Sequence, residues 1–260
     1  MPYNIVVCVK QVPDTTDVKI DPETKTLVRE GVPSIVNPFD TYALEEGIRI
    51  RERAGGKVTV LSMGPPQAVE ALKECLAVGA DEAVLLTDRA FAGSDTLATA
   101  YALSLAIKKL GADIVLCGKQ AWDGDTAQVG PGVAEELDVP HATYVRKMTL
   151  DGGSAVVERL VEGGYEKVRV PLPALFTVVK EINEPRLPSL RGKIKAKSAR
   201  IPVWGPQDIG ADTARLGLGG SPTEVVRVFS PEIRKRGEVL DIPACEAAQY
   251  LLSKLEGVIR

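Results

Sequence analysis

Strand and helix patterns alternate through the first 140 residues of this 260-residue chain, and this alternation limits the fold more than any other feature. Apolar runs predict strands at 5–9, 58–61, 83–86 and 114–117, and helical patterns occupy 41–53, 67–78, 96–110 and 128–137. Gly79 and Gly111 directly follow two of these helices, as is common where a helix ends. This order predicts an α/β fold with a parallel, helix-covered sheet, whose ligands bind beyond the carboxyl ends of the strands.

Hairpins are expected in two places. One, from 18–21 and 26–28, follows the first strand. The others follow residue 142, where β-rich runs at 143–150, 155–161, 165–170 and 174–179 are separated by D-G-G, E-G-G and P-L-P. These runs predict antiparallel strands that extend the sheet. Beyond residue 182 the chain is irregular and Pro-rich until a last helix at 244–255. We therefore expect one α/β domain at 1–183 and an arm at 184–260 that docks on another protein.

Composition excludes several classes of function. Net charge is −3, which gives no reason to expect nucleic acid, and no apolar run approaches the ~20 residues of a membrane helix. The start of the chain lacks the features of a signal peptide, and its four cysteines are widely spaced without C-x-x-C, so we expect a cytoplasmic protein. His141 is the only histidine, and a surface or loop position suits it. Neither metal ligands nor catalytic side chains are expected.

The stretch from Cys117 to Gly132, C-G-K-Q-A-W-D-G-D-T-A-Q-V-G-P-G, leads from a buried strand into a helix. A small-residue loop before a helix presents unpaired backbone N–H groups at the positive end of the helix dipole. This favours a cradle for nucleotide phosphates, although a Gly-rich turn without a ligand would have the same pattern. The expected contacts are Gly118, Asp123, Gly124, Asp125, Thr126, Ala127, Gln128, Val129, Gly130 and Pro131.

Other polar groups follow predicted strands and could meet this loop at one edge of the sheet. They are Cys8, Val9 and Lys10; Ser62 and Met63; and Ser94, Asp95, Thr96 and Thr99 in the turn A-G-S-D-T-L-A-T. Asn37, Phe39 and Asp40 precede the first long helix. Asp40 could accept a hydrogen bond from a ribose hydroxyl or a purine amino group, or could simply cap the helix. The G-S-D-T turn could likewise bind a ligand or simply cap the helix that follows it.

Several motifs together resemble the β-subunit of electron-transfer flavoproteins. They are V-C-V-K-Q-V-P-D at 7–14, N-P-F-D at 37–40, G-K-Q-A-W-D at 118–123 and P-L-P-A-L-F-T-V-V-K-E-I-N-E-P-R-L-P-S-L-R-G-K-I-K-A-K at 171–197. The resemblance covers nearly the whole chain. It implies a Rossmann-like fold that binds an adenine nucleotide at the positions matching Cys8, 37–40, Met63 and 123–134, and it implies an α-subunit partner.

Three motifs depart from ordinary members of that family, which hold structural AMP. These are N-P-F-D at 37–40, D-G-D-T-A-Q-V-G-P at 123–131 and G-S-D-T-L-A-T at 93–99. All three resemble the branch whose β-subunit holds FAD and bifurcates electrons. The resemblance then implies NADH as hydride donor, with electrons passing to the α-subunit FAD and to ferredoxin or flavodoxin. An ordinary AMP-holding member and a stand-alone nucleotide-binding regulatory domain remain the alternatives.

Residues 184–200, here called the recognition segment, carry six basic residues and one acid, a local net charge of +5. A solvated basic loop would show the same charge, but aromatic residues that could stack on bases are absent. In the resembled family this segment docks an acyl-CoA dehydrogenase-like partner, with a leucine anchor at the place of Leu190. Docking would then use Leu190, Arg191, Lys193 and Lys195, an apolar anchor flanked by charge.

Overall fold

A computed structural model describes residues 2–14, 33–226, 237 and 239–256. By its contacts the chain divides into two units, 1–226 and 227–260. In the second unit, α6 (Ala244–Leu255) matches the helix expected at 244–255. The hairpin expected at 18–21 and 26–28 lies outside the described residues.

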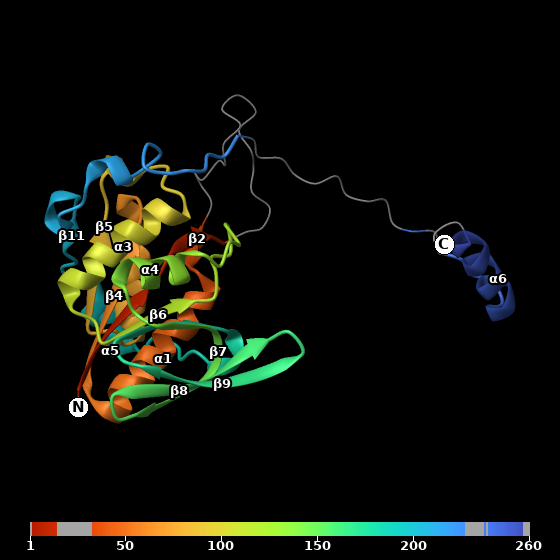
Figure 1. Ribbon diagram of the computed structural model, residues 1–260, viewed down its shortest axis with the longest axis horizontal. Coiled ribbons are helices and arrows are strands. Elements are labelled where there is room, and N and C mark those ends of the chain that lie inside the picture. The colour runs from red at the N-terminus through yellow and green to blue at the C-terminus, as the bar shows by residue number, and fades with distance from the viewer. Residues whose placement is uncertain (1, 15–32, 227–236, 238, 257–260) are drawn as a thin grey trace. The chain divides into compact units, whose positions relative to one another are not determined.

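The first unit is built on a nine-stranded sheet in the order β11-β5-β4-β1-β6-β10-β7-β8-β9 (Figure 1). Its strands are β1 (Tyr3–Cys8), β4 (Gly56–Met63), β5 (Glu82–Leu86), β6 (Ile114–Gly118), β7 (His141–Asp151), β8 (Ser154–Val161), β9 (Gly164–Pro171), β10 (Ala174–Val178) and β11 (Val203–Trp204). The six strands from β11 to β10 run parallel, as does the β10–β7 pair. β2 (Gln11–Pro13) and β3 (Ser34–Val36) form a separate antiparallel pair. The predicted α/β class with a parallel, helix-covered sheet is confirmed.

Helices cover both faces of the sheet and divide the core in two. Side chains of α1 (Pro38–Ala54), α2 (Val69–Val78) and α5 (Leu190–Lys197) pack with one face. Those of α3 (Thr96–Leu110) and α4 (Val129–Leu137) pack with the other (Figure 1). Strands buried on both faces are nearly continuous apolar runs, as in β6, because neither face meets water. This arrangement leaves the carboxyl ends of the strands as the open edge.

The prediction for 174–179 was wrong in one respect. β10 is not part of an antiparallel hairpin; it lies between β6 and β7 and runs parallel to both. All five of its residues are buried, which suits a central strand, whereas β8 and β9 form the expected antiparallel extension. The turn signal P-L-P before it marks the return of the chain into the centre of the sheet.

The recognition segment is more regular than its prolines suggested. It contains α5, and β11 then pairs with β5 and covers that edge of the sheet. Residues 184–226 thus share the compact unit of the α/β sheet, and the division by contacts falls after 226. His141 is exposed, as expected for a surface position, at the first residue of β7.

Candidate functional site

The order of the strands reverses around β1, and this creates the crevice where α/β proteins bind ligands. From β1 the chain passes to β4 and β5 on one side and returns to β6 on the other. The carboxyl ends of β1 and β6, at Cys8 and Gly118, are paired neighbours and flank this switch point. Two of the predicted site segments, residues 8–10 and the loop that begins at Gly118, therefore start side by side.

Loop 119–128 connects β6 to α4 and has the backbone expected of an anion cradle. Asp125 and Ala127 adopt left-handed conformations, with φ of 51° and 54°. The backbone N–H groups of Thr126, Ala127, Val129 and Gly130 have no acceptor among the described residues. They lie in the last turn of the loop and the first turn of α4, where the helix dipole is positive. Such a cluster suits the phosphates of a nucleotide.

Two contacts fix the position of this cradle. A Cβ on Gly130 would meet the Thr177 Cγ2 atom at 2.5 Å, so the start of α4 lies directly on β10. The Thr96 hydroxyl donates to the Gln128 side chain at 3.0 Å, which joins the G-S-D-T turn to the cradle. The structure thus brings together the G-S-D-T turn and the loop that follows β6, two of the segments that the sequence singled out.

Asn37 holds the loop from below. Its amide donates to the Gln120 carbonyl at 2.8 Å, and its side-chain oxygen accepts from the Trp122 N–H at 2.9 Å. Both polar groups of this buried side chain are thereby used. Asn37 thus shapes the loop through bonds to its backbone.

Asp40 joins the two strands at the switch point. Its carboxylate accepts from the Lys10 N–H at 2.8 Å and from the Gly118 N–H at 3.2 Å. Burial raises the pKa of Asp40 to about 7, although these hydrogen bonds and the Lys10 charge lower it. Asp40 is not the helix cap: α1 begins at Pro38, after Asn37, because proline suits the first position of a helix.

The side chains of the loops after β1 and β6 also meet. Lys10 forms an ion pair with Asp123, 2.6 Å from Nζ to Oδ1, across the mouth of the crevice. Cys8 and Cys117 lie side by side below it, both buried. Contact with Cys8 and burial raise the pKa of Cys117, so the Cys117 thiol stays neutral. Val9 belongs to the core.

Ser62 offers a free hydroxyl at the same edge. Its side chain is 1% exposed at the carboxyl end of β4, and its oxygen has no hydrogen-bond partner among the described residues. Met63, which follows it, is only half-buried. A buried hydroxyl without a partner costs stability unless a ligand completes it.

The G-S-D-T turn has a structural task besides its contact with the cradle. Asp95 caps α3 through the N–H groups of Leu97 and Ala98, and its other oxygen accepts from Thr223. The Ser94 hydroxyl accepts from the Gly217 N–H at 3.1 Å. These residues fasten segment 217–223, while Thr96 faces the cradle and Thr99 is half-buried in α3.

Two residues at this edge, Lys119 and Tyr144, were not singled out from the sequence. The Lys119 ammonium lies 5.5 Å from the ring centres of both Phe39 and Tyr144. Tyr144 has a φ of 57°, uncommon for a bulky residue, and its N–H donates to the Thr177 hydroxyl. Lys119 could have been found from its place directly after a predicted strand; Tyr144 gave no sequence signal.

The recognition segment lies on the α1 and α2 side of the sheet. Leu190 and Ile194 are 77% and 66% exposed on α5, and Arg191, Lys193 and Lys195 are exposed around them. Arg186 is different, because it is paired with Glu45 and Glu52 on α1. The expected anchor and three of the segment's cations are thus available for a partner.

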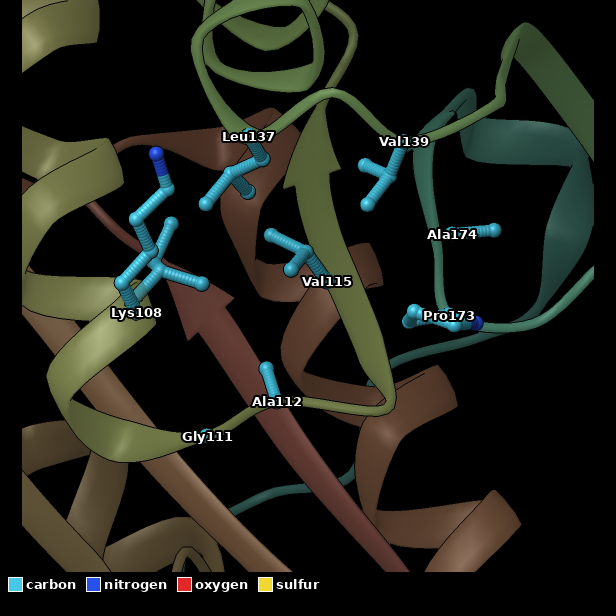
Figure 2. Close-up of a pocket in the computed structure, with 9 residues that line it drawn as sticks. Lys108, Gly111, Ala112, Val115, Leu137, Val139, Pro173 and Ala174 are labelled. Carbon is cyan, nitrogen blue, oxygen red and sulfur yellow. The ribbon is translucent and has the colours of Figure 1, made fainter.

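Other features give no further site. The apolar pocket of about 180 Å³ in Figure 2 lies among the ends of α3 and α4 and the start of β10, at the opposite edge of the sheet. Its only charged lining residue, Lys108, donates to the Glu136 carbonyl, so the pocket lacks convergent polar groups. Across the described residues there is no cluster of side chains that could hold a metal ion. None of the helices described here could cross a membrane.

Comparison with known proteins gives a consistent result. A family model for the electron transfer flavoprotein domain matches residues 24–209. The electron transfer flavoprotein subunit beta of Thermoanaerobacterium thermosaccharolyticum is 57% identical over 253 residues, 97% of each chain. That of Clostridium acetobutylicum is 54% identical over 253 residues, 97% of this chain and 98% of its own. Subunit CarD of the caffeyl-CoA reductase-Etf complex of Acetobacterium woodii is 51% identical over 255 residues, 97% of each chain.

Proposed function

Because the chain belongs to the electron transfer flavoprotein family as a β-subunit, we propose that it forms a heterodimer with an α-subunit and binds FAD at the switch point between β1 and β6. The single observation that carries this proposal is the run of open N–H groups at Thr126, Ala127, Val129 and Gly130. These groups fit the phosphates of an adenine dinucleotide, and the free Ser62 hydroxyl offers a further hydrogen bond nearby.

FAD is favoured over AMP by the surroundings of the cradle. The G-S-D-T turn contacts it through Thr96, and Asn37 of N-P-F-D bonds to the same loop, so the three segments that differ from AMP-holding members adjoin one site. Those segments supply small or polar residues where a flavin ring would extend beyond an AMP-sized ligand. The similarity to a subunit named for a caffeyl-CoA reductase-Etf complex supports the same branch.

FAD bound here would supply the redox chemistry of the proposed bifurcation, which links NADH to the α-subunit FAD and to ferredoxin or flavodoxin. The chain's own residues bind and position the cofactor. Asn37 fixes the loop, and Lys10 with Asp123 covers the mouth. Asp40 would hold the ends of β1 and β6 together beneath the loop by accepting from the Lys10 and Gly118 N–H groups.

The recognition segment would deliver electrons onward from the α-subunit FAD by docking an acyl-CoA dehydrogenase-like flavoenzyme. Leu190 would enter an apolar pocket of that partner, while Arg191, Lys193 and Lys195 would attract its acidic rim. The arm from residue 227 onward would wrap the α-subunit. We place the complex in the cytoplasm.

Cofactor content of the purified heterodimer tests the proposal. Denaturation should release two FAD per αβ pair and little AMP, measured by chromatography against nucleotide standards. One FAD with one AMP would instead identify an ordinary one-flavin carrier and would refute bifurcation while leaving the family intact. Reduction by NADH in the absence of partners provides a second, independent readout.

A further inference from the structure

The recognition segment is fastened to α1 at its beginning by charged hydrogen bonds. Arg186 donates from Nε to Glu45 at 2.8 Å and from Nη1 and Nη2 to Glu52 at 2.6 and 2.9 Å. The Arg186 N–H donates to Glu45 as well, and Arg49 donates to the Glu184 carbonyl at 3.1 Å. Glu45 is 2% exposed, so its charge depends on these partners. The guanidinium therefore bridges two carboxylates about two turns apart on the same face of α1.

The other end of the segment is fastened to α2. A Cβ on Gly192 would collide with the Ala77 carbonyl oxygen, so α5 lies in direct backbone contact with the end of α2. Ala196, one turn later, is buried in the same core. The Ser189 side chain accepts from the Gly192 N–H at 3.0 Å and caps α5.

The large apolar side chains of the segment are exposed to solvent, close to these attachments. Leu187, directly after Arg186, is 88% exposed, and Leu190 and Ile194 point away from the core on α5. Exposed apolar side chains on a backbone fixed at both ends have few conformations to lose when a partner binds.

We propose that Arg186, clamped by Glu45 and Glu52, is a positioning residue that holds Leu187 and Leu190 in their docking arrangement before a partner arrives. The inference rests on the proposed function only for the identity of that partner. Without the side-chain clamp, only the Arg186 N–H bond to Glu45 and the Arg49 bond to the Glu184 carbonyl would hold this end of the segment, and docking would have to order Leu187 to Ser189. Lysine would not replace this arginine, because a single ammonium lacks the planar fork that reaches two carboxylates.

The test uses the heterodimer with its α-subunit, with Arg186→Gln and Arg186→Lys. Arg215→Gln is the matched control: Arg215 also fastens an irregular segment to a helix through Glu136, but that helix, α4, packs on the opposite face of the sheet from α5. Hydrogen exchange should become at least ~10-fold faster at the Gly192 and Lys193 amides in Arg186→Gln, because both bond to Ser189. Arg215→Gln should leave these amides unchanged.

The second readout is electron transfer to a purified acyl-CoA dehydrogenase, measured over a range of its concentration. Arg186→Gln should raise the KM for that acceptor ~5-fold or more with kcat, FAD content and NADH reduction unchanged, and Arg186→Lys should resemble Arg186→Gln. The proposal is overturned if amide exchange in Arg186→Gln is the same as in wild type. It is also overturned if the wild-type reaction saturates with the acceptor and Arg186→Gln has the same KM. If Arg186→Gln fails to fold, Glu52→Gln removes half of the clamp at an exposed position and should show the same effects more weakly. Absence of any wild-type transfer would refute the proposed partner, and amide exchange would then still decide the role of Arg186.

Discussion

At the scale of single residues, Asp40 is the most unusual group of the site. A carboxyl group that bridges two backbone N–H groups at the switch point would normally be ionised, but burial outweighs those bonds and raises its pKa to about 7. Between about pH 4 and pH 7 the folded chain therefore holds a proton at Asp40 that the unfolded chain has lost. This carboxyl makes folding less favourable as the pH rises through that window.

The variant Asp40→Asn should remove this pH dependence. Asparagine cannot ionise, and it loses one of the two backbone bonds at a roughly constant cost of about 1 kcal/mol. Relative to wild type, the stability of the variant should thus improve between pH 5 and pH 8 by about 2–3 kcal/mol, because about two pH units separate pH 5 from the folded pKa of about 7. Thermal unfolding midpoints of both proteins at the two pH values give the measurement. A difference that stays constant with pH would mean that Asp40 is already ionised at pH 5.

At the scale of elements, patterning predicted some parts well and others poorly. α3 has the expected bounds because Asp95 caps it and Gly111 ends it, both local signals. β10 was assigned to the wrong kind of pairing, because a short apolar run after a turn does not reveal whether the chain returns to the centre of the sheet. The candidate site shows the same division. The small and polar residues of loop 119–128 predict a binding loop from sequence alone. The Lys119–Tyr144 contact depends on the left-handed backbone of Tyr144, which only the fold reveals.

Loop 119–128 itself makes the next prediction. Thr126→Arg and Gly124→Val should abolish nucleotide binding, because each places bulk in the cradle where backbone must approach phosphate. The fold should survive, since a Cβ on Gly124 meets nothing within 4 Å and Thr126 is exposed. Gly153→Val, at an equally open glycine in the β7–β8 turn, is the control. Released nucleotide per heterodimer is the measurement, and full β-subunit nucleotide in both variants would mean that the phosphates lie elsewhere.

At the scale of the whole molecule, the fold separates the cofactor site from the docking surface. The cradle lies at the carboxyl edge of the sheet, between β6 and α4, whereas α5 rests on α2 on the other face. Proline content suggested an arm from residue 184, but the contacts of Arg186 and Gly192 could not be read from composition. Because the two regions share no side chain, each should be separable by mutation.

Leu190→Ala and the charge reversals Lys193→Glu and Lys195→Glu should affect docking in different ways. Leu190→Ala removes an anchor that is 77% exposed and touches no cofactor residue. It should weaken electron transfer to the acyl-CoA dehydrogenase-like partner ~10-fold or more, the scale of a hot spot worth above ~1–2 kcal/mol. The charge reversals should lower the association rate instead, and this effect should fade at high salt as the charges are screened.

Stopped-flow transfer to the partner at two ionic strengths distinguishes these effects, with NADH reduction of the isolated heterodimer as the internal control. The Leu190→Ala defect should persist at high salt, because apolar burial is not screened, while flavin content and NADH reduction stay near those of wild type. If Leu190→Ala slowed reduction by NADH as much as it slowed electron transfer to the partner, α5 would also support the cofactor site. In that case the two faces of the sheet would not act independently, and Leu190 would be acting through the fold and not through a partner's pocket.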